Sequence, residues 1–405
     1  MSASKNASRP SQSDPVAMLR DLIRAESVTP DAGPALDVVG DWLEPAGFEV
    51  SRPEFSKQGT PDVENLFAAI GAGEKHLTFA GHVDVVPPGD VGLWTHPPFS
   101  ATEDKGEIYG RGAVDMKGGI AAMAAGTLRF LARRGPEFGG RISFLITGDE
   151  EGPAVNGTVR LLEWAKARGE TFSAAIVGEP TSAERLGDQV KIGRRGSLSA
   201  ILTVTGVQGH AAYPHMADNP LRGLTTLLDA LLSAPLDGGS EHFEPSTFEV
   251  ISADVGNPAW NVIPGSATAR FNSRYNDLWS RESLMAEISG RLERAADNRR
   301  LRPGAKEPIR WQLDWQPSPS DVFLTGDDEL IALVSNAVRQ VTGEKPVLST
   351  GGGTSDARFI KNYCPVVEFG LVGQTMHQTD ERVAVADVEA AARIYEALLE
   401  NCFPS

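Results

Sequence analysis

The feature that most constrains the fold is a set of short apolar runs in the first half of the chain, each the length of a buried β-strand. They are NLFAAI (65–70), HLTFAGHVD (76–84), RISFLITGDEE (141–151) and AAIVGEP (174–180). Between these runs, apolar residues recur at the spacing of an α-helix, most clearly at 117–133 and 158–168. Strands that alternate with helices predict an α/β fold with a mixed, largely parallel sheet flanked by helices.

The pattern changes between about residues 195 and 310. Strands and helices are expected there in the order β-α-β-β-α-β, at 197–206, 221–233, 246–253, the run after Pro264, 282–296 and 309–315. This order is the split unit of a ferredoxin-like layer. After this region, predicted strands again alternate with helices. The sequence therefore predicts an inserted α+β ferredoxin-like domain at 195–308, between the two parts of the first domain at 1–194 and 309–405.

Composition excludes several classes of protein. The net charge of −16 argues against a nucleic-acid partner, which would need a basic surface. No apolar run reaches the ~20 residues that span a bilayer, and the N-terminus has no signal-like segment, so no membrane partner is expected. Only two cysteines, Cys364 and Cys402, favour a reducing compartment, and we expect a cytoplasmic protein. Residues 1–13 form a polar tail with no predicted function.

Histidine and acidic side chains gather where the predicted strands end. The residues concerned are His82, Asp84, Glu150, Glu151 and Glu179, with Asp115 just before a predicted helix. The carboxyl ends of strands in an open α/β sheet meet at one ligand crevice. Each residue alone is ordinary, as a surface histidine, a turn or a helix cap, but their coincidence indicates a site for zinc or a similar divalent ion.

The charges of a two-metal site can be balanced without one of these carboxylates. Two divalent ions would be balanced by Asp115, Glu151, Glu179 and a hydroxide, which leaves Glu150 uncoordinated. A free carboxylate beside an activated water is what a general base requires.

Several motifs make the chain similar to the di-zinc acylase and carboxypeptidase metallohydrolases over nearly its whole length. They are GHVDVVPPGD (81–90), GRGAVDMKGG (110–119), ITGDEEG (146–152), GEPT (178–181), GRRGSL (193–198), GHAAYPHMADNP (209–220) and GGGTSDARF (351–359). GRRGSL and GHAAYPHMADNP resemble the desuccinylase branch of that family. The inserted domain would then be a dimerisation lid.

The resemblance implies roles for the metal-binding residues. His82 and Glu179 would hold one Zn²⁺, Glu151 and His377 the other, and Asp115 would bridge them. Co²⁺ or Mn²⁺ are alternatives to zinc.

The catalytic residues implied by the resemblance are Asp84, Glu150 and His210. The Asp84 side chain would bond the far nitrogen of His82. Glu150 would be the general base, and His210 would reach the site of the partner subunit in a homodimer and stabilise the oxyanion. The peptide bond between Asp115 and Met116 would be cis.

The resemblance also implies a small dicarboxylate substrate, N-succinyl-L,L-2,6-diaminopimelate, which would be hydrolysed to succinate and L,L-2,6-diaminopimelate in lysine and meso-diaminopimelate synthesis. The matching substrate-binding positions are Arg194, Ser197, Tyr213, Asn261, Arg274, Gly353 and Thr354. Trp260 departs from the family pattern, which often has asparagine there.

Alternatives remain open. An acetylornithine deacetylase, a carboxypeptidase or an aminoacylase would share the metal site, and a non-catalytic metal-binding homologue would keep the fold but not the chemistry. A dinucleotide-binding enzyme is disfavoured because the run from Gly110 to Asp115 lacks the third glycine. A serine hydrolase is disfavoured because no G-x-S-x-G elbow is present.

Overall fold

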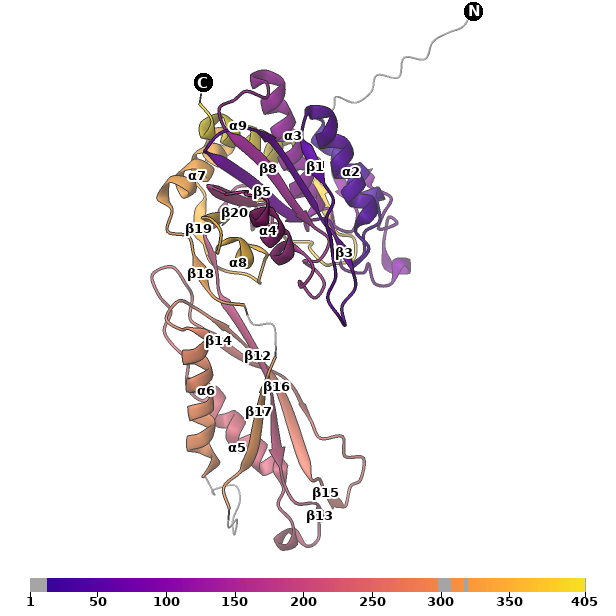
Figure 1. Cartoon of the computed structure of the whole chain (residues 1–405). Coiled ribbons are helices and arrows are strands. Elements are labelled where there is room, and N and C mark those ends of the chain that lie inside the picture. The colour runs from indigo at the N-terminus through magenta and orange to yellow at the C-terminus, as the bar shows by residue number, and fades with distance from the viewer. Residues whose placement is uncertain (1–12, 298–306, 317–319, 405) are drawn as a thin grey trace, which may run out of the picture. The chain divides into compact units, whose positions relative to one another are not determined.

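The computed structural model describes residues 13–297, 307–316 and 320–404. These fall into two compact units, drawn in Figure 1. Unit 1 contains the described residues up to Ile192, Thr325–Ser349 and those from Ser355 onward, and unit 2 contains Gly193–Leu324 and Thr350–Thr354. The N-terminal tail, apart from Ser13, lies outside the described residues.

The units differ from the predicted domains by two residues at the first boundary, by the segment Thr350–Thr354, and most of all at the second boundary. The prediction ended the inserted domain at residue 308, before the strand β17 (Arg310–Trp315). That strand pairs along six residues with β12 (Gly196–Thr205), so it belongs to the sheet of unit 2, which continues to Leu324. The predicted boundary was wrong because it separated the last strand of the split unit from its hydrogen-bonding partner.

Unit 1 is built on a central sheet of eight strands in the order β1-β4-β8-β5-β9-β20-β10-β19. Neighbours from β8 to β20 are parallel, whereas β1, β4 and β8 pair antiparallel. The predicted mixed sheet is therefore confirmed. The strands are β1 (Glu49–Ser51), β4 (Leu66–Gly71), β5 (His76–His82), β8 (Arg141–Thr147), β9 (Ala174–Val177), β10 (Gln189–Lys191), β19 (Val347–Ser349) and β20 (Val366–Glu368).

Helices cover both faces of this sheet because its strands are apolar on both sides. Adjacent residues of β4 point to opposite faces. Ala68 belongs to the core formed with the helices α3 (Lys117–Arg134) and α9 (Val385–Cys402), whereas Phe67 contacts Trp164 of α4 (Thr158–Ala167). Figure 1 shows α4 on one side of the sheet and α3 and α9 on the other.

The remaining elements of unit 1 are shorter or peripheral. Asp14 caps the first helix by accepting hydrogen bonds from Val16 N and Ala17 N, and Pro15 occupies the first helical position. The helices are α1 (Pro15–Arg24), α2 (Gly33–Leu43), α7 (Asp328–Thr342) and α8 (Ala357–Ile360), and the strands are β2 (Glu54–Phe55), β3 (Val63–Glu64), β6 (Thr102–Asp104), β7 (Glu107–Tyr109) and β21 (Arg382–Ala384).

Unit 2 is an antiparallel sheet in the order β14-β16-β12-β17 with two helices on one face. Alternate residues of β12 from Leu198 to Val204 are buried against α5 (Pro220–Leu232) and α6 (Arg281–Ala296). The chain order is the predicted β-α-β-β-α-β, completed by β14 (Thr247–Asp254) and β16 (Ser266–Tyr275). Short pairs join β11 (Gly193–Arg194) to β18 (Phe323–Leu324) and β13 (Gly209–His210) to β15 (Val262–Ile263).

No helix within the described ranges has the length and apolar character needed to cross a bilayer.

Candidate metal centre

The site is built where three neighbouring parallel strands of unit 1 end. His82 is the last residue of β5 and lies level with Thr147, the last residue of β8. Glu150 and Glu151 follow β8, and Glu179 follows β9 on the other side of β5. The parallel register therefore brings these side chains to one edge of the sheet, as the sequence predicts.

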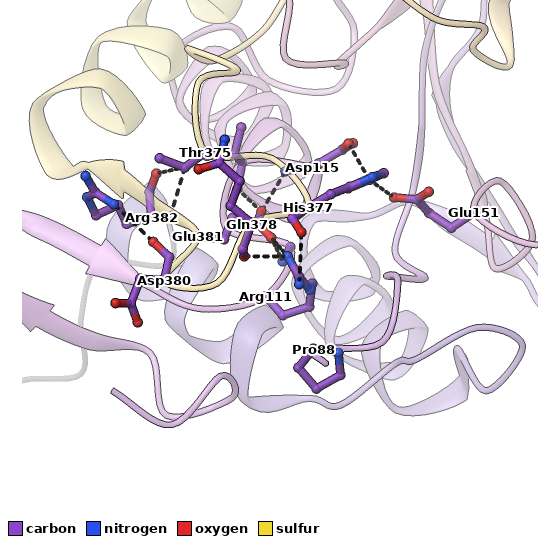
Figure 2. Close-up of polar contacts among 12 residues, drawn as sticks. Pro88, Arg111, Asp115, Glu151, Thr375, His377, Gln378, Asp380, Glu381 and Arg382 are labelled. Atoms are coloured by element: carbon purple, nitrogen blue, oxygen red, sulfur yellow. Dashed lines mark hydrogen bonds and ion pairs between the residues drawn. The ribbon is translucent and has the colours of Figure 1, made fainter. Parts of the chain in front are cut away.

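Asp115 lies between two histidines. Its Oδ1 is 3.3 Å from Nε2 of His82 and its Oδ2 is 3.2 Å from Nε2 of His377. Glu151 Oε1 is 2.7 Å from the same nitrogen of His377, and Glu179 Oε1 is 3.9 Å from Nε2 of His82. Figure 2 shows Asp115, His377 and Glu151 pointing toward one another. The structure thus brings all five predicted ligands together.

The charges of the site fit a bound cation. Burial opposes protonation of His82, but Asp115 and the nearby carboxylates raise its pKa well above the ordinary value. Hydrogen bonds with Asp115 and Glu151 raise the pKa of His377 to about 10. The same histidines lower the pKa of Asp115 despite its burial. The imidazoles therefore lie in a field of negative charge that a divalent ion would balance.

The donor atoms also have the right chemistry and spacing. Ligand atoms of His82, Asp115 and Glu151 all lie within 4.8 Å of one another. Imidazole nitrogen with carboxylate oxygen suits zinc, cobalt or manganese, and a carboxylate with one oxygen toward each histidine can bridge two ions. The residues present fit a metal centre.

Glu150 differs from its neighbour Glu151. Burial and the negative charge of Asp356 raise the pKa of Glu150 well above its ordinary value. Asp356 is itself buried and accepts a hydrogen bond of 2.6 Å from Thr158 Oγ1. A carboxyl group with a raised pKa beside a metal centre is suited to accept and return a proton.

Asp84 does not make the side-chain contact with His82 that the family resemblance implies. Nδ1 of His82 donates to the main-chain carbonyl of Asp84 at 2.8 Å, whereas the Asp84 carboxylate lies 3.7 Å from that nitrogen. The carboxylate instead accepts from the main-chain N–H groups of Glu150, at 3.3 Å, and Glu151, at 3.0 Å. Those amides compete for its oxygens, so Asp84 fixes the His82 ring through its backbone and the Glu150–Glu151 pair through its side chain.

Two buried carboxylates near the site were missed by the sequence analysis. Asp149 accepts main-chain hydrogen bonds from Ala154, Val155 and Asn156 and so shapes the loop after β8. Glu381 accepts from the turn that carries Asp115. Their partners are mostly main-chain N–H groups, which leave no mark in a side-chain pattern. The peptide bond between Asp115 and Met116 is cis, as the resemblance implies.

The predicted substrate-binding residues lie in unit 2, in two groups. Ser197 and Arg274 are paired residues of β12 and β16, and Arg194 is buried and donates to the carbonyl of Gly353 at 3.0 Å. Thr354 follows Gly353 in the short segment that belongs to unit 2.

The second group lies at the pairing of β13 and β15. His210 pairs with Val262, its Nδ1 accepts from Ala212 N at 3.0 Å, and its ring centroid is 5.7 Å from that of Tyr213. The carbonyl of Asn261 accepts from Ala211 N at 2.9 Å. His210 is exposed, and the side chain of Tyr213 is more than half exposed, so both are free to meet another molecule.

Solved structures share this fold at low sequence identity. A tripeptidase from Staphylococcus aureus aligns with a TM-score of 0.75 at 18% identity, over 96% of this chain and 98% of the other. Human carnosine dipeptidase 1 aligns with a TM-score of 0.72 at 19% identity, over 97% of each chain. A dinuclear metal-binding peptidase from Bacillus subtilis aligns with a TM-score of 0.66 at 15% identity, over 96% and 97%.

The sequence itself matches a family model over most of its length. The model is that of peptidase family M20/M25/M40, and the match runs from residue 78 to residue 401. It includes every residue of the metal centre described above, from His82 to His377. The chain therefore belongs to peptidase family M20/M25/M40.

Proposed function

We propose that this member of the family hydrolyses N-succinyl-L,L-2,6-diaminopimelate to succinate and L,L-2,6-diaminopimelate. The observation that carries a hydrolase of this kind is the position of Asp115 between His82 and His377, with Glu150 and Glu151 on the adjacent loop. The succinyl substrate rests on the motifs GRRGSL and GHAAYPHMADNP.

In this proposal His82 and Glu179 would hold one ion, Glu151 and His377 would hold the second, and Asp115 would be shared. Two divalent ions, zinc first among the candidates, would polarise the acyl carbonyl and lower the pKa of water in the site. Glu150 accepts a proton from the attacking water and returns it to the nitrogen of the leaving amine. The Asp84 carboxylate keeps Glu150 in place by accepting a hydrogen bond from the main-chain N–H of Glu150.

The cationic side chains of unit 2 support an anionic substrate. Burial and the neighbouring charge of Arg195 lower the pKa of Arg274. Across the described parts of the chain, neither guanidinium has an acidic partner within ion-pair distance. Two adjacent arginines without a counter-ion favour a ligand with carboxylates, as a succinyl group and an amino acid provide.

The exposed His210 supports a role between subunits. It belongs to unit 2 and has its Nδ1 occupied by Ala212, which leaves Nε2 available as a hydrogen-bond donor. In the proposal the enzyme is a homodimer, and His210 of one subunit stabilises the oxyanion in the site of the other.

The test is a substrate panel after reconstitution with zinc. N-succinyl-L,L-2,6-diaminopimelate, N-acetylornithine and a dipeptide are compared by kcat/KM, with the Glu150→Ala variant as the inactive control. Preference for the succinyl substrate by at least tenfold supports the proposal. Preference for acetylornithine or the dipeptide would support the proposed reaction, amide hydrolysis, but would contradict the proposed succinyl substrate.

A further inference from the structure

Glu381 is a buried carboxylate four residues after the metal-site residue His377, and it is saturated with hydrogen bonds. Oε1 accepts from the main-chain N–H groups of Val114, at 2.9 Å, and Asp115, at 3.2 Å. Oε2 accepts from Gly112 N at 3.0 Å and from Arg111 Nη1 at 2.7 Å. Glu381 is fully buried, so these four donors replace water as its partners.

These bonds fix the turn that presents Asp115. Three of the four donors are amides between Gly112 and Asp115, and converging N–H groups bind a carboxylate strongly. Gly112 has φ of +81°, a left-handed conformation, and a Cβ there would lie 2.6 Å from Val85 Cγ1. The turn therefore has little freedom to move, and Glu381 ties its amides to one point.

Arg111 extends the same contact to His377. Besides Glu381, its guanidinium donates to the carbonyls of Gln378, at 3.2 Å, and His377, at 3.5 Å. His377 has φ of +60°, a conformation that costs a non-glycine residue on the order of 1 kcal/mol and that persists only when its surroundings hold it. Figure 2 shows the guanidinium of Arg111 beside Glu381 and the main chain of His377 and Gln378.

We propose that Glu381 and Arg111 are positioning residues for the metal centre, because together they hold the main chain of Asp115 and of His377 at a fixed spacing. Neither side chain is a metal ligand. The Glu381–Arg111 pair thus fixes the positions of Asp115 and His377, which are distant in sequence but lie 3.2 Å apart. The proposal rests on the metal-dependent function given above.

The experiment measures metal affinity directly, so it does not depend on the substrate. Glu381→Gln keeps the size of the side chain but turns an NH₂ group toward N–H donors. Arg111→Lys keeps the charge but cannot reach Glu381 and both carbonyls together. Zinc affinity is measured by competition with a chromophoric chelator, and the Co²⁺ form by its visible spectrum. We expect roughly 10- to 100-fold weaker binding and an altered Co²⁺ spectrum in both variants.

The matched control is Glu107→Gln. Glu107 forms an ion pair of 3.1 Å with Arg382 in the same part of unit 1, but its side chain is 39% exposed and does not contact the Asp115 turn. Its zinc affinity should equal that of the wild type. Circular dichroism of the metal-free proteins identifies the variants that fold. If Glu381→Gln does not fold, the zinc affinity of Arg111→Lys tests the positioning role.

The outcomes separate the two proposals. Folded variants with wild-type zinc affinity and an unchanged Co²⁺ spectrum would overturn the positioning role, while the proposed function would stand. A wild-type protein that binds no divalent ion would overturn both.

Discussion

Nε2 of His377 lies 3.2 Å from Oδ2 of Asp115, although more than half of the chain separates the two residues in sequence. The opposite oxygen of Asp115 faces His82 at 3.3 Å. One carboxylate thus joins a ligand at the end of β5 to a ligand on a late loop. The predictions for metal content follow from this position.

Removal of the Asp115 carboxylate should disrupt both metal positions. We expect Asp115→Asn to lose most bound metal, and Glu179→Gln, which changes the carboxylate 3.9 Å from His82, to lose part of it. Metal per chain after zinc reconstitution is measured by atomic emission, with Glu163→Gln on the exposed face of α4 as control.

Exhaustive chelation should abolish hydrolysis by the wild type; persistent turnover in the chelated protein would refute a metal centre at Asp115.

Loss of the Glu150 carboxyl should separate metal binding from catalysis. The Glu150→Ala variant keeps all five proposed ligands, so its metal content should match the wild type. Its kcat should fall by roughly 10²- to 10⁴-fold, because the proton of the attacking water has no acceptor. Steady-state kinetics beside metal analysis test this. Unchanged turnover would exclude Glu150 as the base.

The proposed role of His210 across subunits predicts complementation. His210→Ala and Glu150→Ala homodimers should each be nearly inactive. Mixing them by denaturation and refolding should restore about a quarter of wild-type activity, since half of the dimers would be mixed and each would hold one intact site. If the mixture is no more active than either parent variant, His210 does not act in the site of the partner subunit.

Arg274 should select for a carboxylate on the acyl group. Arg274→Ala should raise KM for the succinyl substrate by roughly 10- to 100-fold, the value of a charge-assisted hydrogen bond, and affect an acetyl analogue little. Arg270→Ala is the matched control, because Arg270 lies on the same strand and is exposed. Equal effects of Arg274→Ala on both substrates would argue that the residue is structural.

His76 should make the stability of the fold depend on pH. Burial lowers its pKa to about 4, with Nε2 held 2.8 Å from Ser143 Oγ. The folded state keeps the ring neutral while the unfolded state takes up a proton near pH 6.5, so stability falls as pH drops from 6.5 toward 4, by at most about 3 kcal/mol.

Urea unfolding of the metal-free protein tests the contribution of His76. The loss of unfolding free energy between neutral and mildly acidic pH should be smaller in His76→Gln than in the wild type. Parallel pH dependences in the two proteins would show that this ring is not responsible.

The sheet and the ligand set were predictable because their signals are local. Apolar runs mark β5, β8 and β9, and acidic residues directly follow them, so parallel pairing alone brings Glu151 and Glu179 to His82. The assignment of His377 needed a family resemblance, since no strand or helix pattern ties it to the sheet edge.

The remaining features depend on contacts between distant segments. The strand at 310–315 was predicted as the last strand of the split unit, but the boundary at residue 308 needed its long-range pairing with β12 to be placed correctly. The bond from His82 to the Asp84 carbonyl, rather than to its carboxylate, follows from the nearby amides of Glu150 and Glu151. Glu381 could not be recognised because its main-chain partners carry no sequence signal.

Unit 1 is interrupted in sequence by unit 2, and this order has a consequence for biosynthesis. A ribosome releases His82, Asp115, Glu151 and Glu179 early, then must translate all of unit 2 before His377 and Glu381 emerge. Since domains generally fold as they are made, the nascent chain holds an incomplete ligand set for most of its elongation. A hydrolytic centre can therefore mature only near the end of translation, and a transcript truncated before codon 377 would yield an inert polypeptide.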